Sequence, residues 1–232
     1  MKPDCVLVIM AKAARLGAVK TRLSACLPSA AITGLYRCLL EDTVDLAKSL
    51  DGVETAVMSP AGDVEDLAHM LGNRAQVVAQ TGDGLGAGLT SVFAHFAVDS
   101  GRRTVAFNSD SPHLPSSALR LAFDTLRTCD LVVGPTHDGG YYLVGGKASH
   151  PALFAAGAMG TASALQALLE RTAALGLSVR SLDPFYDVDV PADLNRLAEE
   201  LRLAPERAPR TARWLAEWAG TAAQASANFP DL

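Results

Sequence analysis

The sequence contains only four cysteines, and none of them is spaced like a zinc ligand or a redox pair. Cys5, Cys26, Cys38 and Cys129 lie far apart, with neither a CxxC pair nor the spacing of a disulfide framework. We therefore expect reduced thiols that pack as small apolar side chains. The five histidines also lack the spacing of metal ligands, and no catalytic triad or zinc signature is recognisable.

A long apolar segment and an excess of basic residues are also lacking. The first apolar run, residues 5–11, is too short to span a bilayer, and no small-residue cleavage site follows it. The formal net charge is −5 at pH 7, whereas a protein that binds nucleic acid is normally basic. These absences predict a cytoplasmic protein that binds neither membranes nor nucleic acid.

What the chain does contain is a regular alternation of strand-like and helix-like patterns. Its 232 residues fit one large domain, and no repeat or low-complexity linker divides them. The alternation predicts a mainly parallel sheet with helices on both faces. Strands are predicted at residues 5–10, 54–58, 76–79, 104–107 and 131–134, and helices at residues 29–50, 64–71, 89–98 and 117–127.

After Pro135 the pattern changes, and it predicts a mixed sheet with an antiparallel insertion. We assign residues 1–204 to one domain and residues 205–232 to a helical tail. Trp214 and Trp218 have helical spacing in this tail, which favours packing on the same domain, with a homodimer contact as the alternative. The predicted elements are strands at residues 141–144, 179–182 and 186–190, and helices at residues 162–175 and from Pro191 to about 203.

Two aspartates one residue apart, Asp187 and Asp189, lie in the predicted strand 186–190. Side chains alternate between the two faces of a strand, so both carboxylates would point to the same side. Like charges repel unless something neutralises them, and hard carboxylate oxygens suit Mg²⁺ or Mn²⁺. The alternative is a pair of solvated acids on an edge strand.

Four cations crowd the loop directly after the first strand. Lys12, Arg15, Lys20 and Arg22 share this loop with Gly17. Ligands of open parallel sheets bind beyond the carboxyl ends of the strands, so the position favours a site for a polyphosphate. The loop is not a P-loop, because no glycine immediately precedes Lys20. An ordinary basic surface loop is the alternative.

A glycine-rich segment, residues 80–88, lies between the third strand and the next helix. From Gly82 it loosely matches the dinucleotide fingerprint, which normally follows the first strand instead. Alternating glycines let a backbone approach a ligand closely. We therefore expect Gln80 and Gly84 to contact a base or ribose.

Two further motifs follow strands at the same predicted edge. Asp110, in Asn-Ser-Asp-Ser-Pro, is placed to reach a metal ion or a ribose, or else to cap the next helix. Gly139 and Gly140 precede two tyrosines. Paired glycines at this position are equally consistent with two structures: a tight turn that covers a ligand, or a hairpin connection.

Four motifs in this order resemble an uncharacterised bacterial family with a GT-A-like fold (domain of unknown function 2064). They are K-x-x-x-x-G-x-V-K-T-R-L, N-S-D-S-P, G-P-x-x-D-G-G-Y-Y-L and D-V-D-x-P-x-D-L, and the resemblance covers residues 5 to about 203. The family is similar to nucleotide-diphosphosugar transferases and, more distantly, to molybdopterin-cofactor nucleotidyltransferases and phospholactate guanylyltransferases. The resemblance implies a three-layer, nucleotide-binding α/β/α sandwich.

The resemblance also implies that the basic loop grips phosphates and that Asp110, Asp187 and Asp189 surround a metal ion, Mg²⁺ or Mn²⁺. Lys20 and Asp110 are the expected catalytic residues. The residues expected to contact the nucleotide are Lys12, Gly17, Lys20, Arg22, Gln80, Gly84, Gly139 and Gly140.

The chain departs from related sequences in three places. Prolines are usual where Ala14 and Leu16 stand, which makes this basic loop less rigid. A threonine usually precedes Pro191, and Val190 in its place removes a helix cap. Met159-Gly160 stands where a Trp-Ser pair usually precedes the late helix.

The leading interpretation is a metal-dependent nucleotidyltransferase or glycosyltransferase that uses a nucleoside triphosphate or a nucleotide-sugar and a small acceptor. Positioned cations and Mg²⁺ neutralise the charge of transferring phosphates without a covalent intermediate. An NAD(P)-dependent oxidoreductase is the second interpretation, based on the glycine-rich segment. A non-catalytic nucleotide-binding protein is the third.

Overall fold

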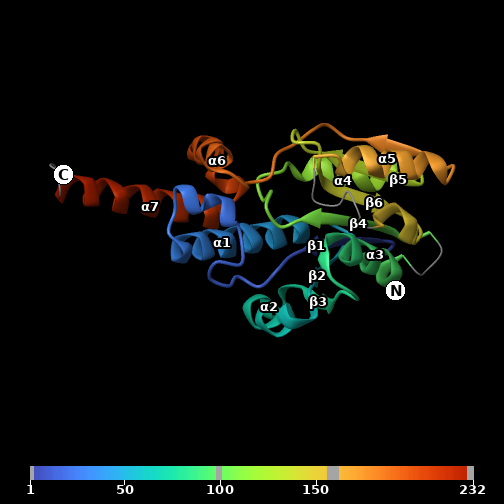
Figure 1. Ribbon diagram of the computed structural model, residues 1–232, viewed down its shortest axis with the longest axis horizontal. Coiled ribbons are helices and arrows are strands. Elements are labelled where there is room, and N and C mark those ends of the chain that lie inside the picture. The colour runs from blue at the N-terminus through green and yellow to red at the C-terminus, as the bar shows by residue number, and fades with distance from the viewer. Residues whose placement is uncertain (1–2, 98–100, 156–161, 229–232) are drawn as a thin grey trace.

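A seven-stranded sheet forms the centre of the protein, and helices cover both of its faces (Figure 1). The computed structural model describes residues 3–97, 101–155 and 162–228. The strand order is β3-β2-β1-β4-β6-β5-β7. The strands are β1 Cys5–Met10, β2 Val53–Ser59, β3 Gln76–Ala79, β4 Arg103–Asn108, β5 Leu131–Pro135, β6 Tyr141–Gly146 and β7 Val179–Ser181.

The helices mostly alternate with the strands along the chain. The α-helices are α1 Ser29–Lys48, α2 Val64–Leu71, α3 Gly84–Phe96, α4 Ser116–Thr125, α5 Ala164–Ala174, α6 Pro191–Leu203 and α7 Pro209–Asn228. Short 3-10 helices are η1 Thr21–Ala25, η2 Ala61–Asp63, η3 Gly72–Arg74, η4 Pro151–Phe154 and η5 Pro205–Arg207. No α-helix of the described residues is both long and apolar enough to cross a bilayer.

The sheet is mixed and mainly parallel, which confirms the predicted fold class. β1 pairs in parallel with β2 and β4, β2 pairs with β3, and β5 pairs with β7. β6 lies antiparallel between β4 and β5 and forms the predicted antiparallel insertion. Because the parallel strands end at one edge of the sheet, the loops that follow them meet there.

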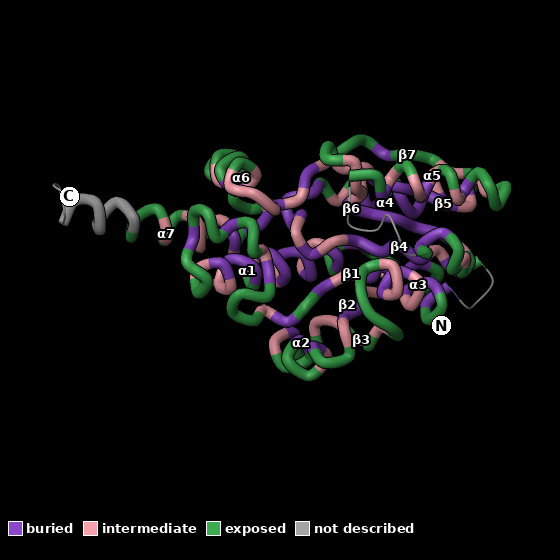
Figure 2. The backbone as a smooth tube through the Cα atoms, in the orientation of Figure 1, coloured by how far each residue is buried: buried purple, intermediate pink, exposed green. Residues whose placement is uncertain are grey.

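Strand β1 is buried on both faces by alternate side chains (Figure 2). Val6 and Val8 belong to an apolar cluster with α3 and α5, whereas Leu7 and Ile9 belong to another with α1, α2 and α4. All four residues are fully buried. A central parallel strand needs apolar side chains on both faces, which explains why its sequence is a continuous apolar run.

A third apolar cluster lies beyond the end of the sheet, between α1, α6 and the start of α7. Leu35 and Leu39 of α1 pack there with Leu197 and Leu201 of α6. The tryptophans of the predicted tail lie on this cluster, and their rings stack with centroids 5.6 Å apart. Helix α7 then extends away from the rest of the molecule (Figure 1).

The segment 186–190, predicted as a strand, is irregular. Its N–H groups are satisfied elsewhere: that of Val188 binds the carbonyl oxygen of Asp110, and the next two bind the Asp193 carboxylate. A segment whose donors are used in this way forms no strand ladder. The predicted strand is therefore wrong, and so is the argument that places its two aspartates on one strand face.

Helix α3 begins at Gly84, five residues before the predicted helix 89–98, so part of the glycine-rich segment is helical. Gly88 is packed too closely for a side chain, because a Cβ atom would lie 2.7 Å from both Gln80 Oε1 and Met10 Cε. Glycine is a poor helix former, so a prediction based on helix propensity places the start of this helix too late. Residue 98 lies outside the described residues.

The other predicted elements are present, with ends that differ by two residues at most. The four thiols are free; Cys5 and Cys129 are buried, whereas Cys26 is exposed and Cys38 is half-buried. The expected packing as small apolar side chains therefore holds for only two of them. Met159-Gly160 lies outside the described residues.

Candidate functional site

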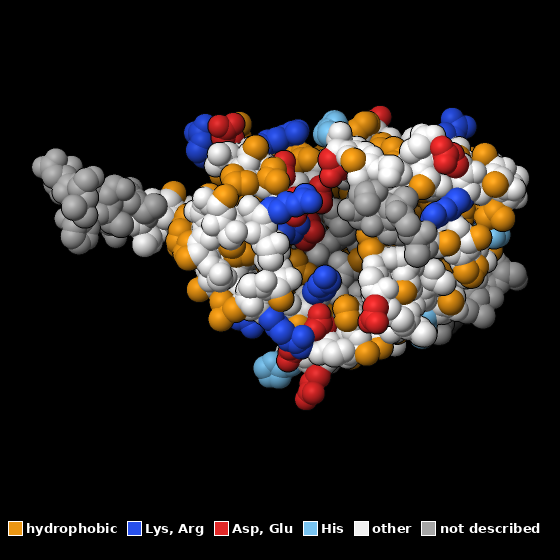
Figure 3. All heavy atoms as spheres, viewed as in Figure 1, with side chains coloured by type: hydrophobic (Ala, Val, Ile, Leu, Met, Phe, Trp, Pro, Cys, Tyr) orange, Lys and Arg blue, Asp and Glu red, His pale blue; other side chains and the backbone are white. Residues whose placement is uncertain are grey.

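Loops after β1, β3, β4 and β5 meet at the carboxyl edge of the sheet. Figure 3 shows lysine, arginine and acidic side chains around a hollow in this face of the molecule. The chain order predicts this meeting, because each of these loops follows a parallel strand. The contacts between the side chains are what the sequence does not reveal.

A buried ion pair between Lys20 and Asp110 lies at the centre of the site. Lys20 Nζ is 2.7 Å from Asp110 Oδ2 and 3.6 Å from Asp189 Oδ1. The Lys20 side chain is only 7% exposed. Burial by itself lowers the pKa of Lys20, but the Asp110 carboxylate, followed by that of Asp189, outweighs burial and holds the pKa above its ordinary value. Lys20 is therefore a charged ammonium in contact with carboxylates.

The backbone of Lys20 is left-handed, with φ 47° and ψ 42°. Among the described residues, it alone has a positive φ without being a glycine. This conformation costs an L-residue about 1–2 kcal/mol. Such strain persists where surrounding contacts fix it and is concentrated at functional sites. The Lys20 carbonyl oxygen accepts from the Leu23 N–H at 2.9 Å, and its ammonium pairs with Asp110, so contacts hold both the backbone and the side chain.

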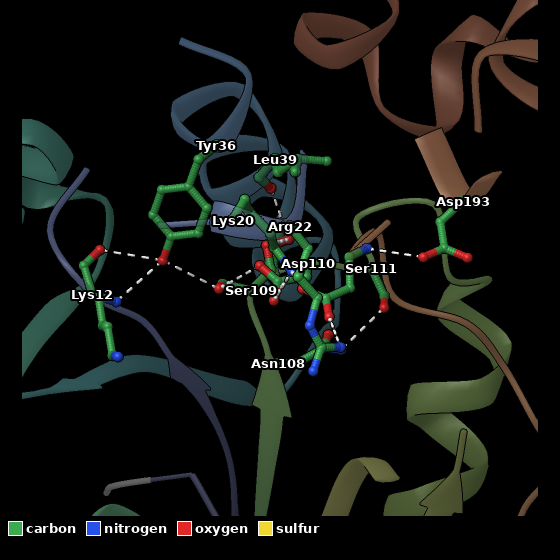
Figure 4. A network of polar contacts seen from close by, with 12 residues as sticks. Lys12, Lys20, Arg22, Tyr36, Leu39, Asn108, Ser109, Asp110, Ser111 and Asp193 are labelled. Atoms are coloured by element: carbon green, nitrogen blue, oxygen red, sulfur yellow. Dashed lines mark hydrogen bonds and ion pairs between the residues drawn. The ribbon is translucent and has the colours of Figure 1, made fainter. Parts of the chain in front are cut away.

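A chain of hydrogen bonds from α1 positions Asp110 (Figure 4). The Tyr36 hydroxyl accepts from the Lys12 N–H at 3.1 Å and lies 3.3 Å from Ser109 Oγ, which donates to Asp110 Oδ1 at 3.0 Å. Burial raises the pKa of Tyr36 to about 12, so its hydroxyl stays protonated. The network links the basic loop to the end of β4.

The carboxylates of Asp187 and Asp189 lie beside this pair and differ in their partners. Asp189 Oδ2 is 2.8 Å from the Arg22 guanidinium. Asp187 has no ion pair with any described residue, and burial raises its pKa, with Lys20 opposing and the other two carboxylates adding to the rise. The three aspartates therefore come together, as predicted, but on an irregular segment.

The first cavity of the site, which we call the lysine cavity, has a volume of about 410 Å³. The N-terminus of α3 opens onto it, and Asp83 makes no side-chain cap there, so the positive end of the helix faces the cavity. Its lining residues are Met10, Ala11, Lys12, Ala18, Val19, Lys20, Tyr36, Met58, Pro60, Gln80, Asp83, Gly84, Leu85, Ser109, Asp110 and Asp189.

The second cavity, which we call the arginine cavity, has a volume of about 490 Å³ and shares Leu85 and Asp189 with the first. The Asp138 carboxylate is held there by the Thr136 hydroxyl and the Gly140 N–H, which keep its pKa below the usual range. The lining residues are Arg22, Leu85, Thr136, Asp138, Gly140, Tyr141, Ala162, Ala164, Asp187 and Asp189.

Three residues of the sequence-based site lie outside both cavities. Arg15 is bound to Asp63 and Asp66 at 2.5 and 2.7 Å, which anchors the basic loop on α2 instead of supplying a free cation. Gly17 lies in the exposed part of the loop, with φ 72°. Gly139 shapes the turn, because φ is 89° and a Cβ atom would collide with the Ala162 carbonyl.

Several lining residues were missed by the sequence reasoning. Tyr36 has the spacing of a core residue of α1, and only its hydroxyl reveals a second role. Met58 lies at the end of β2 and Pro60 directly follows the strand, whose apolar run indicates only a core position. Asp138 belongs to the G-P-x-x-D-G-G-Y-Y-L motif and directly precedes its paired glycines. Its position as an acid shortly after a strand was the signal that could have identified it as a site residue.

The donor chemistry of the three aspartates suits a divalent cation, but their present arrangement does not hold one. Among the described residues, no group of three or more acidic, histidine or cysteine side chains is close enough to bind an ion. The Lys20 ammonium lies between Asp110 and Asp189 instead.

Comparison with known proteins gives one family and several structures. The model of a family described as "Uncharacterized protein conserved in bacteria (DUF2064)" matches residues 43–161. A search of curated proteins found no match. A structure of a putative nucleotide-diphospho-sugar transferase from Desulfovibrio desulfuricans G20 is 28% identical, with 96% of this chain and 98% of that chain covered and a TM-score of 0.85.

Two more distant structures share the fold. The 4-diphosphocytidyl-2C-methyl-D-erythritol synthase of Anaerococcus prevotii is 12% identical, with 85% and 96% of the two chains covered and a TM-score of 0.57. A CMP:2-keto-3-deoxy-manno-octonic acid synthetase in complex with CTP is 15% identical, with 86% and 99% covered and a TM-score of 0.51. The fold is thus that of nucleotidyltransferases and nucleotide-sugar transferases.

Proposed function

The chain belongs to the bacterial family DUF2064, and from this premise we propose that it is a nucleotidyltransferase that transfers the nucleotidyl group of a nucleoside triphosphate to a small acceptor with the help of Mg²⁺ or Mn²⁺. The single observation that carries the proposal is the meeting of cations and carboxylates between two adjoining cavities. The lysine cavity suits the nucleotide, and the arginine cavity suits the acceptor.

The lysine cavity offers both parts of a nucleotide a matching surface. Lys12 is exposed on its wall, and together with the N-terminus of α3 it provides positive charge for phosphates. Met58 and Pro60 provide an apolar surface for a base. Gln80 already donates to the carbonyls of Gly82 and Gly84, which fixes its side chain at the cavity edge.

The transfer itself needs charge stabilisation more than covalent chemistry. An oxygen of the acceptor forms a bond to the α-phosphorus, and the bond from that phosphorus to the oxygen bridging to the β-phosphate breaks. Pyrophosphate leaves with the electron pair, and a hydroxyl acceptor passes its proton to water. We expect Lys12 and Lys20 to neutralise the leaving pyrophosphate.

Asp110, Asp187 and Asp189 are the residues we propose for the cation. A bound Mg²⁺ would polarise the phosphoryl oxygens and orient the triphosphate. It usually takes only one or two carboxylates directly and keeps several waters, so one aspartate is expected to act through water. Arg22 and Asp138 then remain to bind the acceptor in the arginine cavity.

Glycosyl transfer from a nucleotide-sugar is the second candidate, because the 28% identical structure carries that description. The same two cavities would serve it, with a nucleoside diphosphate as leaving group. An oxidoreductase is less well supported, since the glycine-rich segment follows β3, which is an edge strand of the sheet. Dinucleotide fingerprints follow the first strand of their unit.

The test is a product assay with individual nucleoside triphosphates and nucleotide-sugars, Mg²⁺ or Mn²⁺, and pooled small acceptors. Pyrophosphate release that depends on an acceptor supports nucleotidyl transfer, whereas nucleoside diphosphate release from a nucleotide-sugar supports glycosyl transfer. Asp110→Asn should lower the rate by roughly a hundredfold or more. Binding of a nucleotide without any product would favour the non-catalytic interpretation, and a change in nicotinamide absorbance would favour the oxidoreductase.

A further inference from the structure

We propose that Lys20 is a built-in counterion of the empty site: its ammonium excludes the divalent cation until the phosphates of a nucleotide draw it away from Asp110. The inference rests on the proposed function, because it assumes that a nucleotide and a cation share this site. It assigns Lys20 a second role that phosphate binding alone does not require.

The position of the ammonium is the first argument. Lys20 Nζ lies 2.7 Å from Asp110 Oδ2 and 3.6 Å from Asp189 Oδ1, so it faces carboxylates from two separate segments. A metal ion held directly by Asp110 would need the same carboxylate. An ammonium and a divalent ion against the same oxygen would repel each other strongly, so the two cations compete for one position.

Burial is the second argument. The Lys20 side chain is 7% exposed and that of Asp110 is 19% exposed, so water screens their attraction little. Removing the ammonium alone would leave three carboxylates together with only Arg22 to neutralise them, which is costly in a buried setting. Once phosphates bind the Lys20 ammonium, a divalent cation must therefore replace its charge beside the carboxylates.

The backbone is the third argument. Lys20 has a left-handed backbone, and its carbonyl oxygen accepts from the Leu23 N–H at 2.9 Å, so the ammonium can move while the backbone is held. The other end of the basic loop is anchored independently, by Arg15 on Asp63 and by the Ala13 N–H on the same carboxylate. Movement of Lys20 does not require the rest of the loop to detach from α2.

The consequence is a strong coupling between the two ligands. A phosphate offers Lys20 a new anionic partner, and the vacated carboxylates then accept the cation. By linkage the cation must raise nucleotide affinity by the same factor as the nucleotide raises cation affinity. Phosphates that also ligate the cation would raise its affinity without this exchange, so binding of the cation alone is the measurement that isolates the effect of Lys20.

The experiment measures binding of Mn²⁺ alone, by calorimetry or electron paramagnetic resonance, to the wild type and to Lys20→Met and Lys20→Gly. Glycine adopts the positive φ of this position without strain. Lys20→Gly therefore keeps the test possible if Lys20→Met does not fold. Lys12→Met is the matched control, because it removes a lysine from the same cavity whose ammonium is outside the ion pair. Circular dichroism verifies that each variant is folded.

We expect Mn²⁺ to bind the two Lys20 variants roughly tenfold or more tightly than the wild type and the Lys12 control. Equal affinity in all four proteins, or an equal gain in the Lys12 control, would overturn the inference. Tight binding of Mn²⁺ to the wild type without nucleotide would overturn it while leaving the proposed function intact. Absence of Mn²⁺ binding in every protein, even with nucleoside triphosphates added, would overturn the inference and the cation of the proposed function together.

Discussion

His113 is a buried histidine that packs among aromatic rings. Its ring packs against those of Phe185 and Tyr186, with centroids 4.9 and 4.5 Å away. Neither ring nitrogen has a hydrogen-bond partner among the described residues, and the residue is fully buried. Burial, followed by the charges of two arginines, lowers the pKa of His113 to about 3. The imidazole is therefore neutral in the folded protein.

The buried histidine makes stability depend on acid. Its pKa is about 3 when folded and about 6.5 when unfolded, so between these values only the unfolded chain binds the proton. Stability is thus present above about pH 6.5 and falls as the pH drops, by about 2 kcal/mol at about pH 5. His113→Phe should lose less stability over this interval. Urea unfolding of the wild type and the variant at about pH 6.5 and about pH 5 measures how much stability each protein loses. Equal losses in the two proteins would contradict the prediction.

At the scale of a single element, helix α6 has half of a capping arrangement. Asp193 Oδ2 accepts from the N–H groups of Asp189 and Val190 at 3.1 and 2.9 Å. Val190 precedes the helix with an extended backbone, but its side chain has no acceptor for an N–H group of the first turn. The reciprocal bond of a capping box is therefore missing.

A threonine at this position should supply the missing bond. Val190→Thr keeps the shape of the side chain and places a hydroxyl near the N–H groups of Ala192 and Asp193, the second of which now binds only the Val190 carbonyl oxygen, at 3.0 Å. We expect a gain of about 0.5–1 kcal/mol in the free energy of unfolding, measured with urea. Val190→Ala, which removes the methyl groups without adding a hydroxyl, serves as the control. A threonine variant no more stable than the alanine variant would show that the cap does not form.

A buried carboxylate joins the start of helix α7 to α1, in addition to the apolar contacts of the third cluster. The Asp42 side chain is 0% exposed and accepts from the Thr211 N–H and the Thr211 hydroxyl, both at 2.8 Å. The Arg210 guanidinium is 3.1 Å from its other oxygen. These charge-assisted hydrogen bonds fix the first turn of α7 against the middle of α1.

Loss of this charge should be costly. Asp42→Asn keeps the shape but replaces one acceptor with an amide donor, so we expect a loss of about 1.5–3 kcal/mol in unfolding free energy. Asp124→Asn is the matched control, because its ion pair with Arg127 is about two-thirds exposed on both sides and should contribute almost nothing. Equal effects of the two substitutions on the urea midpoint would refute the assignment.

At the scale of the whole molecule, the fold follows from local patterns, whereas the site depends on distant contacts. The apolar run of β1 and the spacing of α1 are visible in the sequence because burial determines them residue by residue. Lys20 and Asp110 are ninety residues apart, and either lysine of the loop has the chemistry to be the partner. Only the folded backbone, with its left-handed Lys20, decides between Lys12 and Lys20.

The same distinction explains the error in the late segment. The alternation of apolar and acidic residues in 186–190 is typical of a strand, and no local signal shows that its N–H groups are taken by Asp110 and Asp193. The three aspartates still meet, because the segment crosses the ends of β4 and β5. Their predicted role as cation ligands stays a prediction.

Chain length at the C-terminus provides the last prediction. The third apolar cluster joins α1 and α6 to Trp214, Leu215 and Trp218 of α7. The tail therefore contributes side chains to an apolar core. Removing residues 205–232 would expose this cluster and leave Asp42 buried without its partners, which should cost several kcal/mol. Thermal unfolding of the truncated and full-length proteins measures this loss, and a truncated chain as stable as the full one would mean that residues 1–204 fold independently of the tail.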